Sequence, residues 1–235
     1  MGSDMAIASV ASLIADPTRS AMLAGLLDGR ALPAGELAYA AGVTAQTASA
    51  HLAKMLAGGL LVVESEGRHR YYRLAGSHVA EALERLAVIS PMEPTRQKPL
   101  SPRAKELQLA RCCYNHLAGR LGVAVAQSLQ SNEFLVPVPD KLFELTPEGV
   151  KWFAKIGVDI HKIKPTRRGL ARQCLDWTER THHLAGPLGV ELLNVFCLRG
   201  WLRRSKDSRV LRVTPSGHAA LKRYLGINAQ LLRET

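Results

Sequence analysis

The sequence contains few of the features that mark membrane or secreted proteins. Its 235 residues include four cysteines, and aromatic residues make up only 5%. No apolar run approaches the roughly 18 residues that a membrane-spanning helix requires. Four cysteines in a chain of this length do not suggest a secreted disulfide scaffold. No signal-peptide pattern stands at the N-terminus. We therefore expect a protein of the reducing cytoplasm that does not enter a membrane.

Sequence motifs of common enzyme classes are also missing. The chain has no P-loop, no GxGxxG after a strand, no nucleophile elbow and no HExxH. Cys174 and His183 could be imagined as a nucleophile and its base, but two residue types alone do not define such a pair. We therefore expect a chain without catalytic activity.

Negative charge is scarce relative to positive charge. The formal net charge is +11, which favours a polyanionic partner. Residues 1–95 hold 7 of the 31 Lys/Arg and 9 of the 20 Asp/Glu, so the surplus lies in the remaining 24 Lys/Arg and 11 Asp/Glu. Either the C-terminal part contacts phosphate or an anionic ligand, or it carries a solvated basic surface.

Residues 5–90 alternate between helical and extended patterns. Asp16 can cap a helix that has Pro17 at its first position, and Gly42 can end a later one. The expected order is helix, helix, short helix, turn, helix, hairpin and helix. Its main segments are 35–41, 44–57, 60–63, 69–74 and 77–89. This order predicts a winged helix-turn-helix.

The helix over 44–57 is the expected recognition helix. Its polar residues are small or hydrogen-bonding, which suits base edges, and no acidic residue lies between Val43 and Val63. Arginines of the following hairpin could contact the phosphate backbone. The predicted contacts to double-stranded DNA are Thr44, Gln46, Thr47, Ser49, His51, Lys54, Arg68, Arg70 and Arg73.

Over residues 6–90 the chain resembles the ArsR/SmtB transcriptional repressors. The resemblance rests on the stretches LIADPTR (13–19), GELA (35–38), TAQTASAHL (44–52), GGLL (58–61) and GRHRYYRL (67–74). It implies a homodimer joined mainly by the first and last helices of this domain. It also implies an operator of two inverted half-sites that is released when a small effector binds.

The ligands of the metal sites familiar in that family are missing. The short helix before the recognition helix has no cysteine, and the last helix has a single histidine, His78, with Glu81 and Glu84 as its carboxylates. We therefore expect the effector to act elsewhere.

A proline-rich segment, 91–102, separates the first domain from a repeated region. HLAGRLG at 116–122 recurs as HLAGPLG at 183–189, and LTPEG at 145–149 recurs as VTPSG at 213–217. Each copy, 103–164 and 165–235, is expected to have a helix that carries the HLAG stretch, a hairpin and a capped helix. The predicted fold class is mainly α with small β-hairpin wings (α+β).

Candidate sensing residues concentrate in this repeat. Cys112, Cys113 and His116 are expected on one helix, and Cys174 and His183 occupy the matching place. Thiolate and imidazole suit a soft metal or metalloid such as Zn²⁺ or Cu⁺, whereas thiols alone could sense oxidants. Simple packing is the third possibility. Nearby Asp176, Trp177 and Arg180 could instead line a small-molecule pocket.

Together these features predict a sequence-specific DNA-binding regulator. The expected form is a repressor that leaves a palindromic operator when an effector is sensed in the C-terminal region. The alternative is a ligand-independent architectural protein that uses several winged units. A single defined palindrome would favour the repressor, and diffuse coverage would favour the architectural protein.

Overall fold

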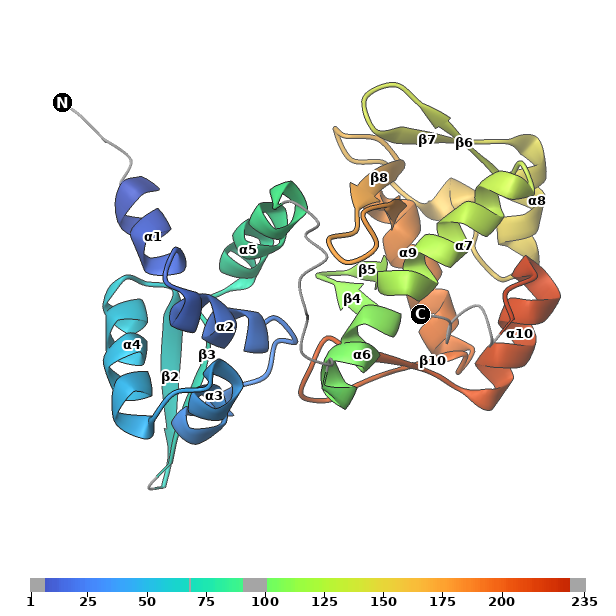
Figure 1. Cartoon of the computed structure of the whole chain (residues 1–235). Helices are drawn as coiled ribbons and strands as arrows, with labels where there is room; N and C mark the ends of the chain where they lie inside the picture. Colours follow the sequence, from blue (N-terminus) through green and yellow to red (C-terminus); the bar gives the residue numbers. More distant parts are fainter. Residues whose placement is uncertain (1–6, 68, 91–100, 229–235) are drawn as a thin grey trace. The chain divides into compact units, whose positions relative to one another are not determined.

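The computed structural model describes residues 7–67, 69–90 and 101–228. It divides into two compact units, Met1–Ile89 and Ser90–Thr235 (Figure 1). Most of the expected proline-rich linker, 91–102, lies outside the described residues, and Pro102 already begins a helix. Among the described residues, no helix is both long and apolar enough to span a bilayer.

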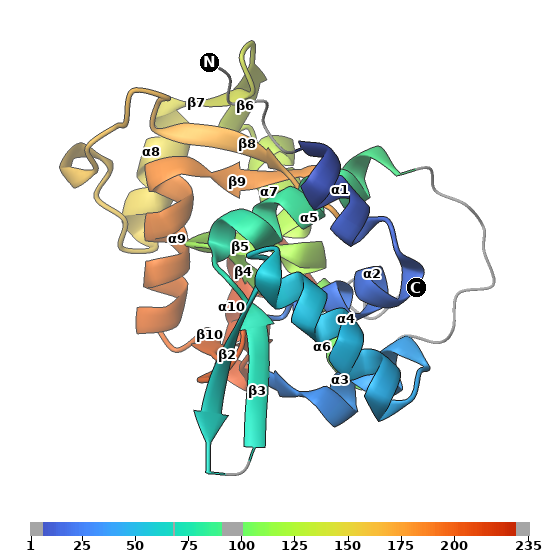
Figure 2. The ribbon, with the colours of Figure 1, turned by 90° about the vertical axis from the view of Figure 1, so that its left-hand side faces the viewer.

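In residues 7–67 and 69–90, the first unit has five helices around a small antiparallel sheet of order β1-β3-β2. Its elements are α1 (Ile7–Ile14), α2 (Pro17–Gly25), β1 (Leu32–Pro33), α3 (Ala34–Ala41), α4 (Ala45–Ala57), β2 (Leu61–Glu66), β3 (His69–Leu74) and α5 (Ser77–Ile89). Buried side chains of α2, α3 and α4, among them Met22, Leu37 and Met55, form the core. In Figure 2 the β2–β3 hairpin extends past the helices of this unit.

Local sequence signals explain where these helices begin and end. Asp16 caps α2 by accepting from the Arg19 N–H at 2.9 Å, and Thr44 caps α4 by accepting from the Thr47 N–H at 3.2 Å. Gly42 ends α3 with a φ of 68°, which glycine adopts at little cost. The expected helices 44–57 and 77–89 are confirmed: they are α4, with Thr44 as its N-cap, and α5. The β2 strand continues to Glu66, beyond the predicted end at Val63.

Apart from α6 of the first copy, the second unit contains the same series of elements twice. The first copy has α6 (Pro102–Leu109), β4 (Arg111–Cys113), β5 (His116–Ala118), α7 (Gly119–Ser131), β6 (Leu135–Val138), β7 (Leu142–Leu145) and α8 (Pro147–Lys155). After η1 (Ile160–Lys162), the second copy has β8 (Ala171–Leu175), β9 (His182–Ala185), α9 (Gly186–Leu198), β10 (Leu202–Arg204), β11 (Leu211–Val213) and α10 (Pro215–Leu225). Helix, hairpin and capped helix follow one another in both copies, as the repeat predicted.

The two copies exchange hairpins. β8 pairs with β7 of the first copy, with Phe143 opposite Ala171, in a sheet of order β6-β7-β8-β9. Correspondingly, β4 lies against β11 of the second copy: the Leu211 N–H donates to the Ala110 carbonyl at 2.9 Å, and the Cys112 N–H donates to the Arg209 carbonyl at 2.8 Å. Each copy therefore completes the other, and one core cluster contains side chains from both.

One expectation for this unit is wrong. Residues 111–113 and 116–118 form the strands β4 and β5, not a helix, so the HLAG stretch begins as a strand and only its glycine enters α7. The same holds for β8 and β9 before α9. Gly119 and Gly186 turn the backbone from strand to helix in the two copies, with φ values of 77° and 79° respectively. A side chain there would also strike a backbone carbonyl, at 2.6 Å and 2.8 Å respectively.

Candidate functional site

The exposed face of α4 carries most of the predicted DNA contacts. Thr44, Gln46, Thr47, Ser49 and Lys54 are all exposed, whereas Ala48, Leu52 and Met55 pack into the core. The hydroxyls of Thr44 and Thr47 lie 2.9 Å apart at the start of the helix. This places short hydrogen-bonding side chains at the end that would lead into a groove.

His51 differs from the other predicted contacts on α4. It is half-buried, and its Nδ1 lies 3.4 Å from the Arg19 guanidinium and 3.7 Å from the Asp16 carboxylate. These neighbours connect α4 to α2 within the unit. His51 is therefore engaged in packing the helices together.

The wing hairpin presents Arg70 to solvent, where its guanidinium lies 5.8 Å from the centre of the Tyr72 ring. Arg73 donates to Glu64 of the neighbouring strand at 2.7 Å, so its charge is partly neutralised. Arg68 lies outside the described residues.

In the second unit, four of the predicted sensing residues converge. The ligand atoms of Cys113, His116, Cys174 and His183 all lie within 4.8 Å of one another. In each hairpin the cysteine stands directly opposite the histidine: Cys113 pairs with His116 across β4–β5, and Cys174 pairs with His183 across β8–β9. The four side chains form what we call the Cys₂His₂ cluster. No disulfide is formed by the four cysteines of the chain.

The two imidazoles of the cluster face each other. Their Nε2 atoms are 3.1 Å apart, and both rings are buried. On the opposite edge of each ring, the Nδ1 atom faces an oxygen: that of His116 lies 2.9 Å from Asn115 Oδ1, and that of His183 lies 3.5 Å from Asp176 Oδ2. The His116 ring is therefore held at hydrogen-bond distance, whereas the Nδ1 of His183 lies at ion-pair distance from Asp176 and forms no hydrogen bond.

The pKa of the Cys174 thiol is strongly lowered by its neighbours. A hydrogen bond from Cys113 is the main cause, and contacts with His116 and His183 add to it. Together they outweigh burial and hold the pKa of Cys174 far below its usual range. A thiolate is the form of cysteine that binds metals and acts as a nucleophile.

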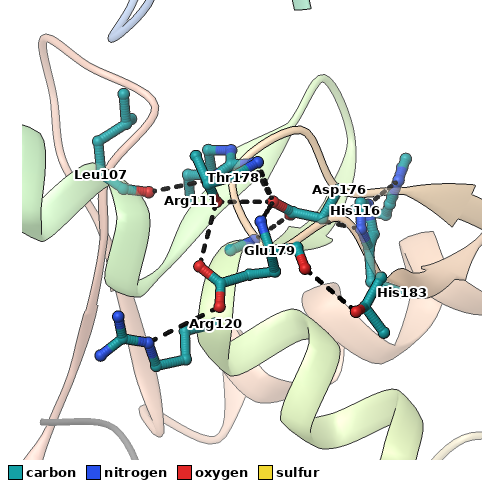
Figure 3. A network of polar contacts seen from close by, with 10 residues as sticks. Leu107, Arg111, His116, Arg120, Asp176, Thr178, Glu179 and His183 are labelled. Carbon is teal, nitrogen blue, oxygen red and sulfur yellow. Dashed lines mark hydrogen bonds and ion pairs between the residues drawn. The ribbon is translucent and has the colours of Figure 1, made fainter. Parts of the chain in front are cut away.

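Asp176 is the centre of a buried polar network behind the cluster (Figure 3). Its carboxylate accepts from the Arg111 guanidinium and from the Gly119 N–H, both at 2.7 Å, and from the Thr178 hydroxyl at 2.7 Å. Burial raises the pKa of Asp176, but the charge of Arg111 and these donors lower it to about 2. Asp176 is therefore an anion that orients His183 and is not itself part of the cluster.

Two predicted sensing residues lie away from the cluster. The Cys112 thiol donates to the Tyr114 carbonyl at 3.3 Å and accepts from Arg204 at 3.4 Å. The Trp177 ring packs against the Arg111 guanidinium, whose carbon lies 5.1 Å from the ring centre. Trp177 therefore covers the buried Arg111–Asp176 ion pair. Sequence reasoning missed the roles of Arg111 and Asn115. The position of Asn115 immediately before a candidate ligand was the available signal.

The comparisons with known proteins agree with this architecture. The helix-turn-helix domain family matches residues 14–64. The uncharacterized HTH-type transcriptional regulator YdfF of Bacillus subtilis (strain 168) is 46% identical over 221 residues, which are 94% of this chain and 97% of that protein. The HTH-type transcriptional regulator CmtR of Mycobacterium tuberculosis is 40% identical over 101 residues, 43% of this chain and 85% of that protein.

Solved structures with similar sequences cover a smaller part of the chain. The winged helix-turn-helix domain Mb0332 of Mycobacterium bovis, described as homodimeric and as a possible ArsR-family regulator, is 34% identical over 35% of this chain and 76% of that chain, with a TM-score of 0.34. The cadmium metal-sensor CmtR of Mycobacterium tuberculosis is 39% identical over 41% of this chain and 100% of that chain, with a TM-score of 0.32.

The near full-length match to YdfF decides the family. This chain belongs to the same family of HTH-type transcriptional regulators as YdfF. It is a DNA-binding transcriptional regulator, and the expectation that it is not an enzyme is confirmed by the transcriptional regulators to which it is related. Within this regulator, the Cys₂His₂ cluster lies in the second unit, outside the matched helix-turn-helix domain.

Proposed function

We propose that this regulator is a homodimeric repressor that binds a palindromic operator through α4 and leaves it when an effector binds to the second unit. The exposed face of α4 is the observation that carries the proposal. It offers Gln46, Thr47 and Ser49 to base edges and has no acidic residue to repel phosphate. As a regulator of transcription, the protein would act in the cytoplasm, on double-stranded DNA.

Exposed apolar side chains on α1 and α5 support the dimer. Ile7 and Val10 of α1 are 65% and 41% exposed, and Leu86 and Ile89 of α5 are 44% and 77% exposed. Large apolar side chains on one helical face are typical of an association surface. The family resemblance assigns these same two helices to the homodimer. A twofold dimer reads two inverted half-sites about 34 Å apart.

The position of the Cys₂His₂ cluster supports an effector site in the second unit. The first unit lacks the cysteines of the family's familiar sites, and His78 and Glu81 on α5 are both exposed. The cluster instead brings together four chemically reactive side chains in a buried setting. A ligand there would act on DNA binding by favouring one conformation of the protein over another.

The operator can be found by selecting bound duplexes from a randomised DNA pool with the full-length protein. We expect one inverted repeat. The Gln46→Ala and Thr47→Ala variants should each weaken binding to it by about 1–3 kcal/mol, because each removes a contact to a base edge. Affinity for unrelated duplex DNA should hardly change. Thr47→Ala keeps the helix cap, since the cap uses the Thr47 backbone N–H.

The matched control is Gln127→Ala, which removes an exposed glutamine from a helix of the second unit. It should leave operator affinity unchanged. If both α4 variants bind the operator as the wild type does, α4 is not the recognition helix. Diffuse footprints without a palindrome would contradict the repressor proposal and favour the alternative, an architectural DNA-binding protein.

A further inference from the structure

The donor atoms of the Cys₂His₂ cluster are those of a tetrahedral metal site. Two thiolates and two imidazoles are a ligand set that Zn²⁺ takes in proteins. With Zn–S near 2.3 Å and Zn–N near 2.0–2.1 Å, a tetrahedron places its donors roughly 3.3–3.8 Å apart. The four ligand atoms already lie within 4.8 Å, and the two Nε2 atoms are 3.1 Å apart. Small side-chain rotations therefore suffice to enclose an ion.

The oxygens behind the imidazoles direct both Nε2 lone pairs inward. An amide oxygen accepts hydrogen bonds but cannot donate them, so Asn115 favours a proton on Nδ1 of His116. At His183 the negative charge of Asp176, 3.5 Å away and without a hydrogen bond, favours a proton on Nδ1. With Nδ1 protonated, each neutral imidazole presents an unprotonated Nε2. Two unprotonated Nε2 atoms at 3.1 Å repel each other, so either a proton shared between them or a cation bound by both must hold them at this distance. An oxygen partner on the other nitrogen is also the usual second shell of a metal-bound histidine.

Charge balance favours a divalent ion. Two thiolates, two neutral imidazoles and one divalent cation sum to zero, which suits a buried site. A monovalent ion would leave a net negative charge among His116 and His183, which are 7% and 1% exposed. The adjacent Arg111–Asp176 pair is neutral and does not compensate such a charge. Cys174 is the one half-buried member, and it offers the side from which an ion could enter.

The cluster also joins the two copies of the repeat. Cys113 and His116 belong to the first copy, and the other pair to the second. Each histidine is backed by a glycine of the other copy: a Cβ at Gly122 would lie 3.6 Å from that of His183, and one at Gly189 would lie 3.5 Å from that of His116. A bound ion would therefore fix the two copies relative to each other.

We propose that one divalent ion with a filled d shell, of the Zn²⁺ and Cd²⁺ class, binds per chain to Cys113, His116, Cys174 and His183. The ion is the effector of the regulator, and in this respect the inference rests on the proposed function.

The test uses full-length, reduced protein from which metal has been removed with a chelator. Co²⁺ serves as the probe because tetrahedral thiolate coordination gives it intense d–d and charge-transfer absorption. We expect one Co²⁺ per chain, displaced by one Zn²⁺. The double variant Cys113→Ser/Cys174→Ser should lose the absorption and weaken Zn²⁺ binding by more than about 100-fold, since it removes both thiolate ligands.

The matched control is Cys112→Ser/Cys197→Ser, which removes the two thiols outside the cluster and should bind as the wild type does. Asn115→Ala provides a second test in case the double cysteine variant fails to fold, because Asn115 is an exposed turn residue whose replacement should not disturb the core. Loss of a second-shell partner should lower Zn²⁺ affinity by roughly 10–100-fold. The site is refuted if the wild type takes up no Co²⁺ or Zn²⁺, or if the cluster variant binds normally. It is also refuted if the control variant loses binding.

Operator binding by the metal-free protein separates the two proposals. If that protein binds the selected operator but takes up no metal, only the metal site fails. If it takes up metal as expected but shows no sequence-specific DNA binding, the repressor fails and the site stands.

Discussion

At the scale of single residues, Asp176 stands out as a charged side chain in the interior of the second unit. Its side chain is fully buried and forms an ion pair with the equally buried Arg111 at 2.7 Å. The N-terminus of α7 contributes the Gly119 N–H, and the positive end of that helix further favours a negative charge. Removing one partner from such a pair leaves the other charge buried without compensation.

We therefore predict that Asp176→Asn lowers the free energy of unfolding of the second unit by about 3–5 kcal/mol at neutral pH. Urea unfolding followed by tryptophan fluorescence measures this change, because all three tryptophans, at 152, 177 and 201, lie in that unit. The exposed Asp159, which pairs with Lys162 at 3.2 Å, provides the control Asp159→Asn. It should have a far smaller effect, since exposed pairs contribute little.

The same residue predicts a dependence on pH. A carboxyl whose pKa is lowered on folding stabilises the protein above its unfolded pKa of about 3.9 and loses this effect as pH falls through its folded pKa. For Asp176 the folded pKa is about 2. The difference in stability between wild type and Asp176→Asn should thus be complete above about pH 5 and shrink toward about pH 2. A difference that stays constant over this range would show that packing, not charge, is responsible.

The residues of the cluster could be predicted only in part. Their types and their matching places in the repeat pointed to Cys113, His116, Cys174 and His183. The sequence could not separate Cys113 from Cys112, because that choice depends on which face of β4 each side chain occupies. Nor could it pair Arg111 with Asp176, which lies 65 residues away and is brought close by the exchange of hairpins.

At the scale of secondary-structure elements, local signals were sufficient where they exist. Caps at Asp16 and Thr44 and the glycine at 42 placed the helices of the first unit. The strands β4 and β5 have three residues each, too few to show an alternating pattern. They are strands because β4 pairs with β5 and its segment is also bonded to a distant one: the Cys112 N–H donates to the Arg209 carbonyl, and the Leu211 N–H donates to the Ala110 carbonyl. Such tertiary pairing overrides local propensity, so a helix was wrongly expected there.

The wing is the element whose contribution to DNA binding can be measured separately. Arg70→Ala should weaken binding to the operator and to unrelated DNA alike, because a phosphate contact carries no sequence information. The slope of log affinity against log salt should fall by about 1 for each phosphate that the variant no longer neutralises. Lys151→Ala removes the same charge from an exposed site in the second unit and should leave the slope unchanged. Equal slopes for Arg70→Ala and wild type would show that Arg70 makes no contact with the phosphate backbone.

At the scale of the whole molecule, the proposed recognition helix α4 and the proposed metal site lie in different compact units. An ion in one unit can regulate the other only if it binds the DNA-bound and DNA-free proteins with different affinity. Such coupling is reciprocal. The factor by which Zn²⁺ weakens operator binding must equal the factor by which the operator weakens Zn²⁺ binding. For typical allosteric proteins this factor is about 5–150-fold.

We predict a factor in this range from both directions. Operator affinity is measured with and without saturating Zn²⁺, and Zn²⁺ affinity is measured by competition with a chelating dye, with and without operator duplex. Asn115→Ala provides the sharpest comparison. It should shift the Zn²⁺ concentration that releases the operator by the same roughly 10–100-fold as it shifts metal affinity. The coupling factor itself should stay unchanged, because the variant alters how tightly the ion binds and not which state it favours. A factor of one in both measurements would show that the ion, even if bound, has a structural role and is not the effector.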